Sequence, residues 1–259
     1  MHSTAATTLT REPARKRDEV AMSTTRTVVS TFGLLAGLAG IEHGVGEILQ
    51  GSVRPEGPVI ESWPDSKAFE ILGGEPAMTV IPNLLVTGIA AVIVAVAVVV
   101  WSVRFVDRRH GGLVLILLCV LLLLVGGGFG PPLIGVIVGI GATRIGTTPG
   151  RRPGRVAQAV GRVWPWVLAA AVLGYLTLLP GTILLGQLLG ADHPGLVYAL
   201  SAFSFAGLIL ALAAARSADR VQAGQRAATM DVLPARRSVD GINAGVLPPV
   251  TGSSGERSS

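Results

Sequence analysis

Half of the 259 residues are hydrophobic and only 14% are charged, whereas a soluble globular protein carries about 25% charged residues. The mean hydropathy is +0.60 and the pI is about 10.3, and several apolar runs approach the roughly 20 residues that span a bilayer. This composition predicts a multi-pass membrane protein. The high pI comes from short arginine clusters between apolar runs, which orient membrane proteins, so we expect no nucleic-acid partner.

The commonest catalytic signatures are missing from the sequence. The single cysteine, Cys119, excludes an intramolecular disulfide. Neither Lys16 nor Lys67 follows a glycine-rich loop, and no histidine lies in an H-E-x-x-H motif. A G-x-S-x-G motif is also absent. We therefore expect no cofactor and no metal ion, and an enzymatic role is less favoured than a non-enzymatic one.

Residues 1–26 are polar and rich in threonine and arginine, which predicts a disordered cytoplasmic tail. Met22 is an alternative start, which would make residues 1–21 an upstream extension. The first predicted span is 28–49, and its G-x-x-x-G steps let another helix approach closely. Cleavage as a signal peptide after Ala39 is the alternative for this segment.

Residues 51–77 carry five acidic and two basic residues and are predicted to form an outer loop. Within it, Ser62–Asp65 resembles a helix start. That short helix would lie on the membrane surface or pack over the other helices. The second predicted span is 78–103, whose length favours a helix over a buried strand.

The third and fourth predicted spans are short, 112–128 and 131–145, and they form a hairpin that turns at Gly126–Pro132. Arginines lie beyond both ends of this pair, which places both ends on the cytoplasmic side. The chain must therefore turn back at the glycines and prolines. Each run is short for a core of roughly 30 Å, so the pair forms either two short spans, which we favour, or a re-entrant hairpin.

The fifth predicted span is 164–189, with a kink at Pro180, and the sixth is 195–215. Residues 216–259 are predicted to be a disordered cytoplasmic tail. All lysines and arginines except Arg54 and Lys67 then lie on the cytoplasmic side. The predicted fold is an all-α polytopic bundle of about six transmembrane helices within 27–215, with both termini cytoplasmic. Its general character resembles small, glycine-rich bacterial inner-membrane proteins, so we expect a bacterial cytoplasmic membrane.

The first predicted span contains three ionisable residues, Glu42, His43 and Glu47. Because charge in hydrocarbon is costly, such residues usually face a cavity or a partner. His43 and Glu47 are four residues apart and are predicted to pair, whereas Glu42 projects about 100° away from His43. The alternative is that the span ends near Glu42 and all three lie among lipid headgroups.

Other polar groups are predicted at a similar depth. Asn83 and Thr87 share a face near the outer end of the second span. The turn residues Gly126, Gly127, Gly128 and Gly130 offer backbone groups that bind an ion or small ligand, or they serve only a close-packed turn. A metal site from Glu42, His43 and Glu47 with Asp192 and His193 has suitable ligand types but no recognised spacing.

These features favour a small transporter or channel-like protein with an outward-facing polar site. The alternatives are a non-catalytic scaffold or partner subunit and, less favoured, an intramembrane enzyme with Glu42 and His43 as acid and base. The expected partners are the lipid bilayer and a second copy or another membrane protein bound through the glycine faces.

Overall fold

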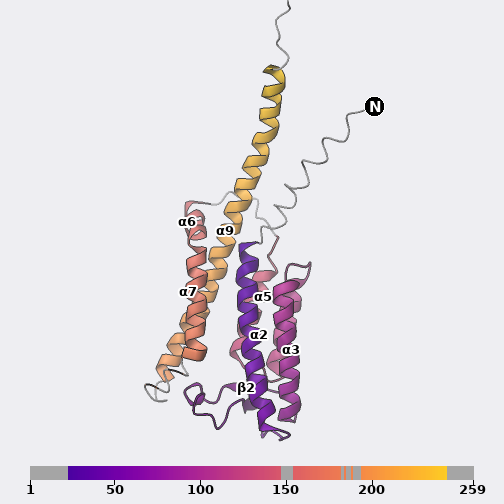
Figure 1. The fold of residues 1–259 in the computed structure, drawn as a ribbon, viewed down its shortest axis with the longest axis vertical. Helices are drawn as coiled ribbons and strands as arrows, with labels where there is room; N and C mark the ends of the chain where they lie inside the picture. The colour runs from indigo at the N-terminus through magenta and orange to yellow at the C-terminus, as the bar shows by residue number, and fades with distance from the viewer. Residues whose placement is uncertain (1–22, 147–153, 182–183, 185–187, 189–193, 244–259) are drawn as a thin grey trace, which may run out of the picture.

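The computed structural model describes residues 23–146, 154–181, 184, 188 and 194–243 (Figure 1). The chain is mostly helical, as the sequence predicts. Residues 1–22 and 244–259, in the two predicted tails, lie outside the described residues. The helices are α2 (Thr24–Gln50), α3 (Leu84–Arg104), α4 (Gly111–Leu124), α5 (Gly130–Ala142), α6 (Arg155–Arg162), α7 (Trp164–Leu176) and α9 (Pro194–Asn243). The shorter elements are β1 (Val59–Glu61), the 3-10 helix η1 (Glu70–Leu72), β2 (Pro76–Met78) and the π-helix η2 (Thr177–Gly181).

Among the described residues, three helices are long and apolar enough to cross a membrane: α2, α3 and the Gly195–Ala228 part of α9. The pair α6 and α7, bent by 54°, also passes this test when taken together. Helices α4 and α5 are apolar but have only 14 and 13 residues. The structure thus supports a membrane protein, and six crossings remain a proposal.

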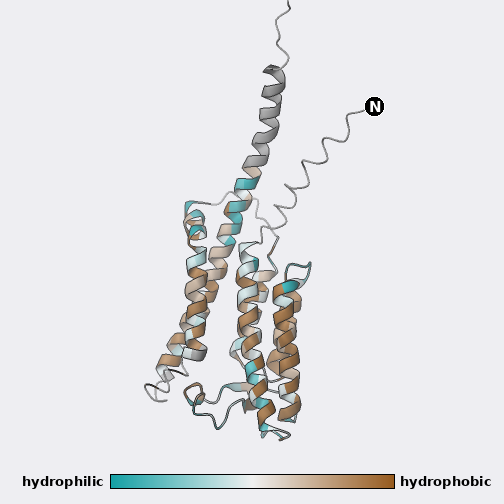
Figure 2. Cartoon of the chain, in the orientation of Figure 1, coloured by the Kyte–Doolittle hydropathy of each residue, from teal (hydrophilic) through white to brown (hydrophobic). Residues whose placement is uncertain are grey.

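The outer surface of the helices suits a lipid environment. Figure 2 shows apolar residues along α3, over most of α7 and over the lower part of α9, with hydrophilic residues in α6 and the adjoining part of α9. Ile93, Leu117 and Leu173 are 64%, 67% and 66% exposed. Apolar exposure on this scale marks a surface that lipid or another protein covers.

Glycines bring α2 and α3 into close contact. A Cβ added to Gly44 would lie 2.8 Å from the Gly88 carbonyl oxygen, and one added to Gly37 would lie 2.9 Å from the Ala95 carbonyl oxygen. Side chains at these positions would push the two backbones apart. The first span's glycine face is therefore filled by α3 of the same chain, and its glycines require no second copy to account for them.

One end of the molecule gathers the arginine-rich connections. The carboxylate of Asp219 in α9 accepts hydrogen bonds from the first N–H groups of α2, at 2.6 Å from Thr24 and 3.0 Å from Thr25. The Arg216 guanidinium donates to the Gly141 carbonyl oxygen at the end of α5, at 3.2 Å. The start of α2, the end of α5 and the middle of α9 therefore meet at one end, beside the α3–α4 connection.

The opposite end holds the loop that contains β1 and β2, which pair antiparallel. The Gly126 N–H donates to the Met78 carbonyl oxygen at 2.8 Å, and the Val80 N–H donates to the Leu124 carbonyl oxygen at 3.0 Å. Strand β2 thus holds the turn between α4 and α5. This turn runs from Val125 to Phe129, because Gly130 already begins α5 with two prolines in its first turn.

The predicted helix start at Ser62–Asp65 in this loop is wrong, because no α-helix begins there. The Ser62 hydroxyl instead donates to Glu47 of α2 at 3.4 Å. The Trp63 ring packs on α2 at Gly46 and stacks on Phe69, with ring centroids 5.0 Å apart. Packing over the helices therefore replaces the alternative of a separate membrane-surface helix.

The second helix begins later than predicted. Met78 belongs to β2, and α3 begins at Leu84. Pro82 has no N–H to donate, and Asn83 caps the helix by accepting a hydrogen bond from the Val86 N–H at 3.2 Å. The apolar run thus contributes its first residues to the loop.

Two segments predicted as loop or tail are helical. Helix α6 lies in the arginine-rich connection, and α9 continues past the predicted end at Ala215 to Asn243. Alanine, arginine and glutamine, frequent in both segments, favour helix even without an apolar stripe. The regular helix α7 ends at Leu176 and is followed by η2, because Pro180 cannot donate to the Leu176 carbonyl oxygen.

Candidate functional site

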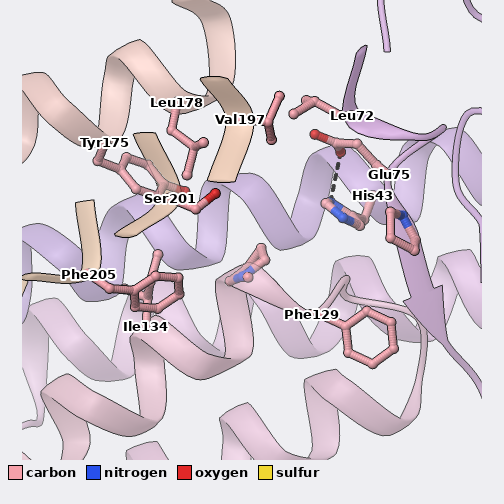
Figure 3. A pocket seen from close by; sticks show the side chains of 13 residues that line it. His43, Leu72, Glu75, Phe129, Ile134, Tyr175, Leu178, Val197, Ser201 and Phe205 are labelled. Atoms are coloured by element: carbon pink, nitrogen blue, oxygen red, sulfur yellow. Dashed lines mark ion pairs between the residues drawn. The ribbon is translucent and has the colours of Figure 1, made fainter. Parts of the chain in front are cut away.

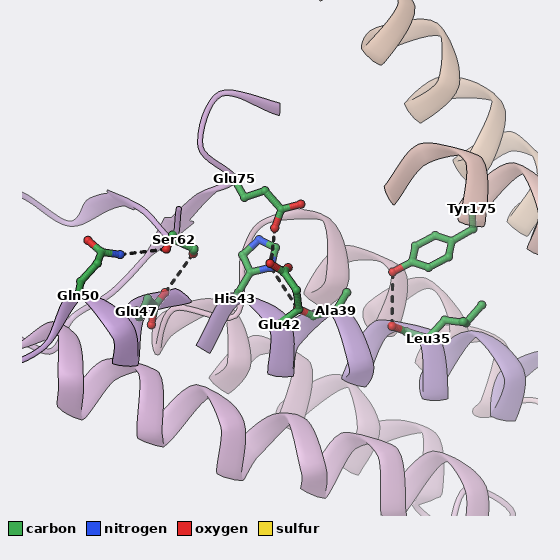
Figure 4. Close-up of polar contacts among 9 residues, drawn as sticks. All are labelled: Leu35, Ala39, Glu42, His43, Glu47, Gln50, Ser62, Glu75 and Tyr175. Atoms are coloured by element: carbon green, nitrogen blue, oxygen red, sulfur yellow. Dashed lines mark hydrogen bonds and ion pairs between the residues drawn. The ribbon is translucent and has the colours of Figure 1, made fainter. Parts of the chain in front are cut away.

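His43 lies at the centre of two carboxylates at the loop end of α2 (Figure 4). Its Nδ1 atom is 3.0 Å from Oε2 of Glu42 and 3.3 Å from Oε2 of Glu75. The same nitrogen lies 3.1 Å from the Ala39 carbonyl oxygen. Glu42 thus contacts His43 although the two residues project about 100° apart on α2. The third residue of the cluster, Glu75, comes from the loop.

More oxygen atoms surround Nδ1 of His43 than its hydrogen can bond. Nδ1 carries at most one hydrogen, yet three oxygen atoms surround it. Both oxygens of Glu42 and Oε2 of Glu75 are buried and accept no well-aligned hydrogen bond. Among the described residues, no lysine or arginine forms an ion pair with these carboxylates. His43 is therefore the one basic side chain in contact with these two carboxyl groups in the described part of the chain.

Glu75 is held in an unusual backbone conformation. Its φ of 53° is the one positive value at a non-glycine residue in the described chain, and such conformations cost about 1–3 kcal/mol. The side chain is only 6% exposed. Burial, followed by the neighbouring Glu42 carboxylate, raises the pKa of Glu75 to about 9. The local fold thus accepts backbone strain to bury a carboxylate beside His43.

Glu47 forms a second polar contact one turn further along α2. It is fully buried, and it accepts a hydrogen bond from Ser62 instead of pairing with His43 as predicted. The Thr87 hydroxyl, also fully buried, lies 2.9 Å from the Thr79 hydroxyl. Glu47 and Thr87 both lie against Gly126.

The glycine turn lies directly on these side chains. Gly126 and Gly128 have φ values of 93° and 76°. An added Cβ at Gly126 would collide with the Glu47 carboxylate, and one at Gly128 would collide with Nε2 of His43. Gly127 packs against Leu122, whereas Gly130 has open space around it.

The remaining predicted residues are not part of the cluster. Asn83 caps α3 and donates to the Ser52 hydroxyl at 2.9 Å, in an exposed position. Asp192 and His193, the other members of the predicted metal set, lie outside the described residues. Glu75 was missed because no local pattern links it to a histidine 32 positions away.

A cavity of about 220 Å³ adjoins the cluster (Figure 3). His43 and Glu75 line one side of it, and Ser201 of α9 supplies a hydroxyl on another. The remaining lining is mostly apolar. It consists of Leu72, Pro76, Phe129, Gly130, Pro131, Ile134, Tyr175, Leu178, Val197 and Phe205. A polar cluster at the side of an apolar cavity is the usual character of a small-ligand site.

In comparisons with known proteins, no protein family, curated protein or solved structure matches this chain. The role of the site is therefore inferred from its chemistry.

Proposed function

We propose that this chain is a small membrane transport protein whose outward-facing site consists of Glu42, His43, Glu75 and the adjoining cavity. The observation that carries the proposal is the burial of two carboxylates and an imidazole between α2 and the loop, with no lysine or arginine of the described residues paired to them. Ionisable groups in this setting mark substrate or ion pathways more often than they serve packing. A purely structural role is better filled by apolar residues of similar volume.

The proposed topology has six crossings, formed by α2, α3, α4, α5, a fifth span that begins with α7, and α9, with α6 on the cytoplasmic side. It is supported by the described connections, because the α2–α3 loop and the α4–α5 turn are bonded to each other at one end. The α3–α4 connection lies at the end where α2 begins, since Asp107 pairs with Arg26, and the charge rule assigns this arginine-rich end to the cytoplasm. The turn between α4 and α5 is bonded to β2 at the other end, which favours two short spans. The membrane would be the cytoplasmic membrane of a bacterium, with both termini inside.

The test is transport by the purified protein in proteoliposomes that contain a pH-sensitive dye. Inorganic cations, organic cations and organic acids are added one at a time, and current across the membrane and internal pH are recorded. We expect a response to at least one solute that Glu42→Gln reduces at least about tenfold, because this change removes the charge and retains the shape. The amount of protein in the liposomes should stay unchanged.

The matched control is Glu56→Gln, which makes the same change at an exposed position of the outer loop and should leave transport intact. If no solute gives a response above that of empty liposomes, or if Glu42→Gln transports as well as the wild type, the proposal is wrong. The scaffold role would then be favoured.

A further inference from the structure

We propose that Glu42, His43 and Glu75 form a binding site for a divalent transition-metal ion of the zinc class, with one coordination position open to the cavity. The proposal deepens the proposed function, because it names the class of ion that the transport site takes. It rests on that function only for the ion's role, since binding is measured separately.

The positions of the three ligand atoms support this site. One atom from each of Glu42, His43 and Glu75 lies within 4.8 Å of the others, and the contacts of Nδ1 with the two carboxylate oxygens are 3.0 and 3.3 Å. Zinc bonds of about 2.0–2.2 Å in tetrahedral geometry place neighbouring ligand atoms roughly 3.3 Å apart. The two distances from Nδ1 to the carboxylate oxygens are therefore close to the spacing that a tetrahedral ion requires.

The unpartnered oxygens give an independent reason for a cation. Glu75 is more than nine-tenths buried, and its Oε2 atom points at His43 without an aligned hydrogen bond. One hydrogen on Nδ1 cannot satisfy the oxygens of Glu42, Glu75 and Ala39 together. A divalent ion would bind both carboxylates and match their combined charge.

The chemistry of the donors selects the type of ion. An imidazole with two carboxylates suits zinc and similar first-row ions, whereas calcium and magnesium prefer oxygen ligands alone. Binding through Nδ1 leaves the hydrogen of His43 on Nε2, which lies against Gly128. The turn between α4 and α5 thus packs against the imidazole ring.

The coordination has room for a fourth ligand. Three protein ligands with an open position are typical of zinc sites that exchange water or substrate, whereas closed structural sites have four. The cavity beside His43 and Glu75 supplies that position. An ion held by three ligands beside a cavity has a route for entry and release, as transport requires.

The experiment measures zinc binding to the full-length protein in detergent, after treatment with EDTA and its removal. We expect one zinc ion per chain by elemental analysis and a single binding event by calorimetry. Cobalt(II) as a second probe should give the strong visible absorption of a tetrahedral site. Loss of even an outer-shell partner weakens metal sites about 10- to 100-fold, so we expect Glu75→Gln to weaken zinc binding more than about 100-fold.

Three variants keep the test decisive. Glu42→Gln and His43→Gln should weaken binding as Glu75→Gln does, and Glu42→Gln, at a partly exposed side chain, is the one least disruptive to folding. The control Glu70→Gln changes an exposed loop glutamate and should bind zinc as the wild type does. Absence of zinc from the wild type, or unchanged binding in folded Glu42→Gln, would overturn the metal site. Transport that still depends on Glu42 would then leave the proposed function standing.

Discussion

Gly128 illustrates how single residues shape the candidate site. Its φ of 76° lies in the left-handed region, where residues with a Cβ atom lose roughly 1–2 kcal/mol. Its missing side chain also leaves room for Nε2 of His43. The same residue thus turns the chain after α4 and allows the imidazole to stay buried next to the turn.

We expect Gly128→Ala to lower the free energy of unfolding by about 2–5 kcal/mol, because backbone strain adds to an overpacking cost of about 1–3 kcal/mol. The measurement is thermal and denaturant unfolding in detergent. Gly130→Ala is the control, since an added Cβ there meets nothing within 4 Å and its φ is not positive. Equal stability of the two variants would show that the turn tolerates a side chain at Gly128, next to His43.

At the scale of elements, the length of an apolar run predicted helices well, whereas helices in polar segments were not predicted. Residues 28–49 were predicted as one helix and lie within α2, because every turn of that segment has apolar residues to bury. The polar segments α6 and 216–243 were predicted as loop or disorder, although their residues favour helix. Hydropathy reports what enters a membrane, and it does not report where a helix ends.

The candidate site was predictable in part for the same reason. Glu42, His43, Glu47 and Thr87 stand out as polar residues in or beside apolar runs, and the glycine turn lies against three of them in the structure. Glu75 could not be found, because its contact with His43 depends on the path of a long loop. That path is set by the pairing of β1 with β2 and by stacking of Trp63 on Phe69, which have no periodic signal.

Asp219 links two elements that are far apart in sequence. Its carboxylate accepts hydrogen bonds from the Thr24 and Thr25 N–H groups and from the Ser23 hydroxyl, at the positive end of the α2 dipole. We expect Asp219→Asn to destabilise the protein by about 1–2 kcal/mol, through weaker hydrogen bonds and loss of the charge. The measurement is thermal unfolding in detergent at low and high salt.

Asp107→Asn is the matched control at the same end of the molecule. Asp107 makes a 3.7 Å ion pair with Arg26 and is half exposed, so its loss should cost no more than about 1 kcal/mol. A larger effect at Asp107 than at Asp219 would contradict capping of α2 by α9.

The whole molecule combines a polar, arginine-rich end with an opposite end where the loop, the glycine turn and the candidate site meet. At the arginine-rich end, hydrogen bonds of Asp219 and Arg216 join α9 to α2 and α5. At the other end β2 joins the turn between α4 and α5. The described α3–α4 connection lies at the arginine-rich end, and the α2–α3 loop and the α4–α5 turn lie at the other end. The side of the membrane on which the arginines lie therefore fixes the orientation of the site.

The proposed topology places the connections before α4 and after α5 on the cytoplasmic side. Single cysteines at His110 and Val156, in a Cys119→Ser background, should therefore resist an impermeant thiol reagent in intact cells and react after lysis. Both positions are exposed, so protection would reflect the membrane rather than burial. Glu56→Cys in the outer loop should react in intact cells. Labelling of only one of the two inner cysteines would mean that α4 and α5 cross as a single span, and it would place one arginine cluster on the outer side together with the candidate site.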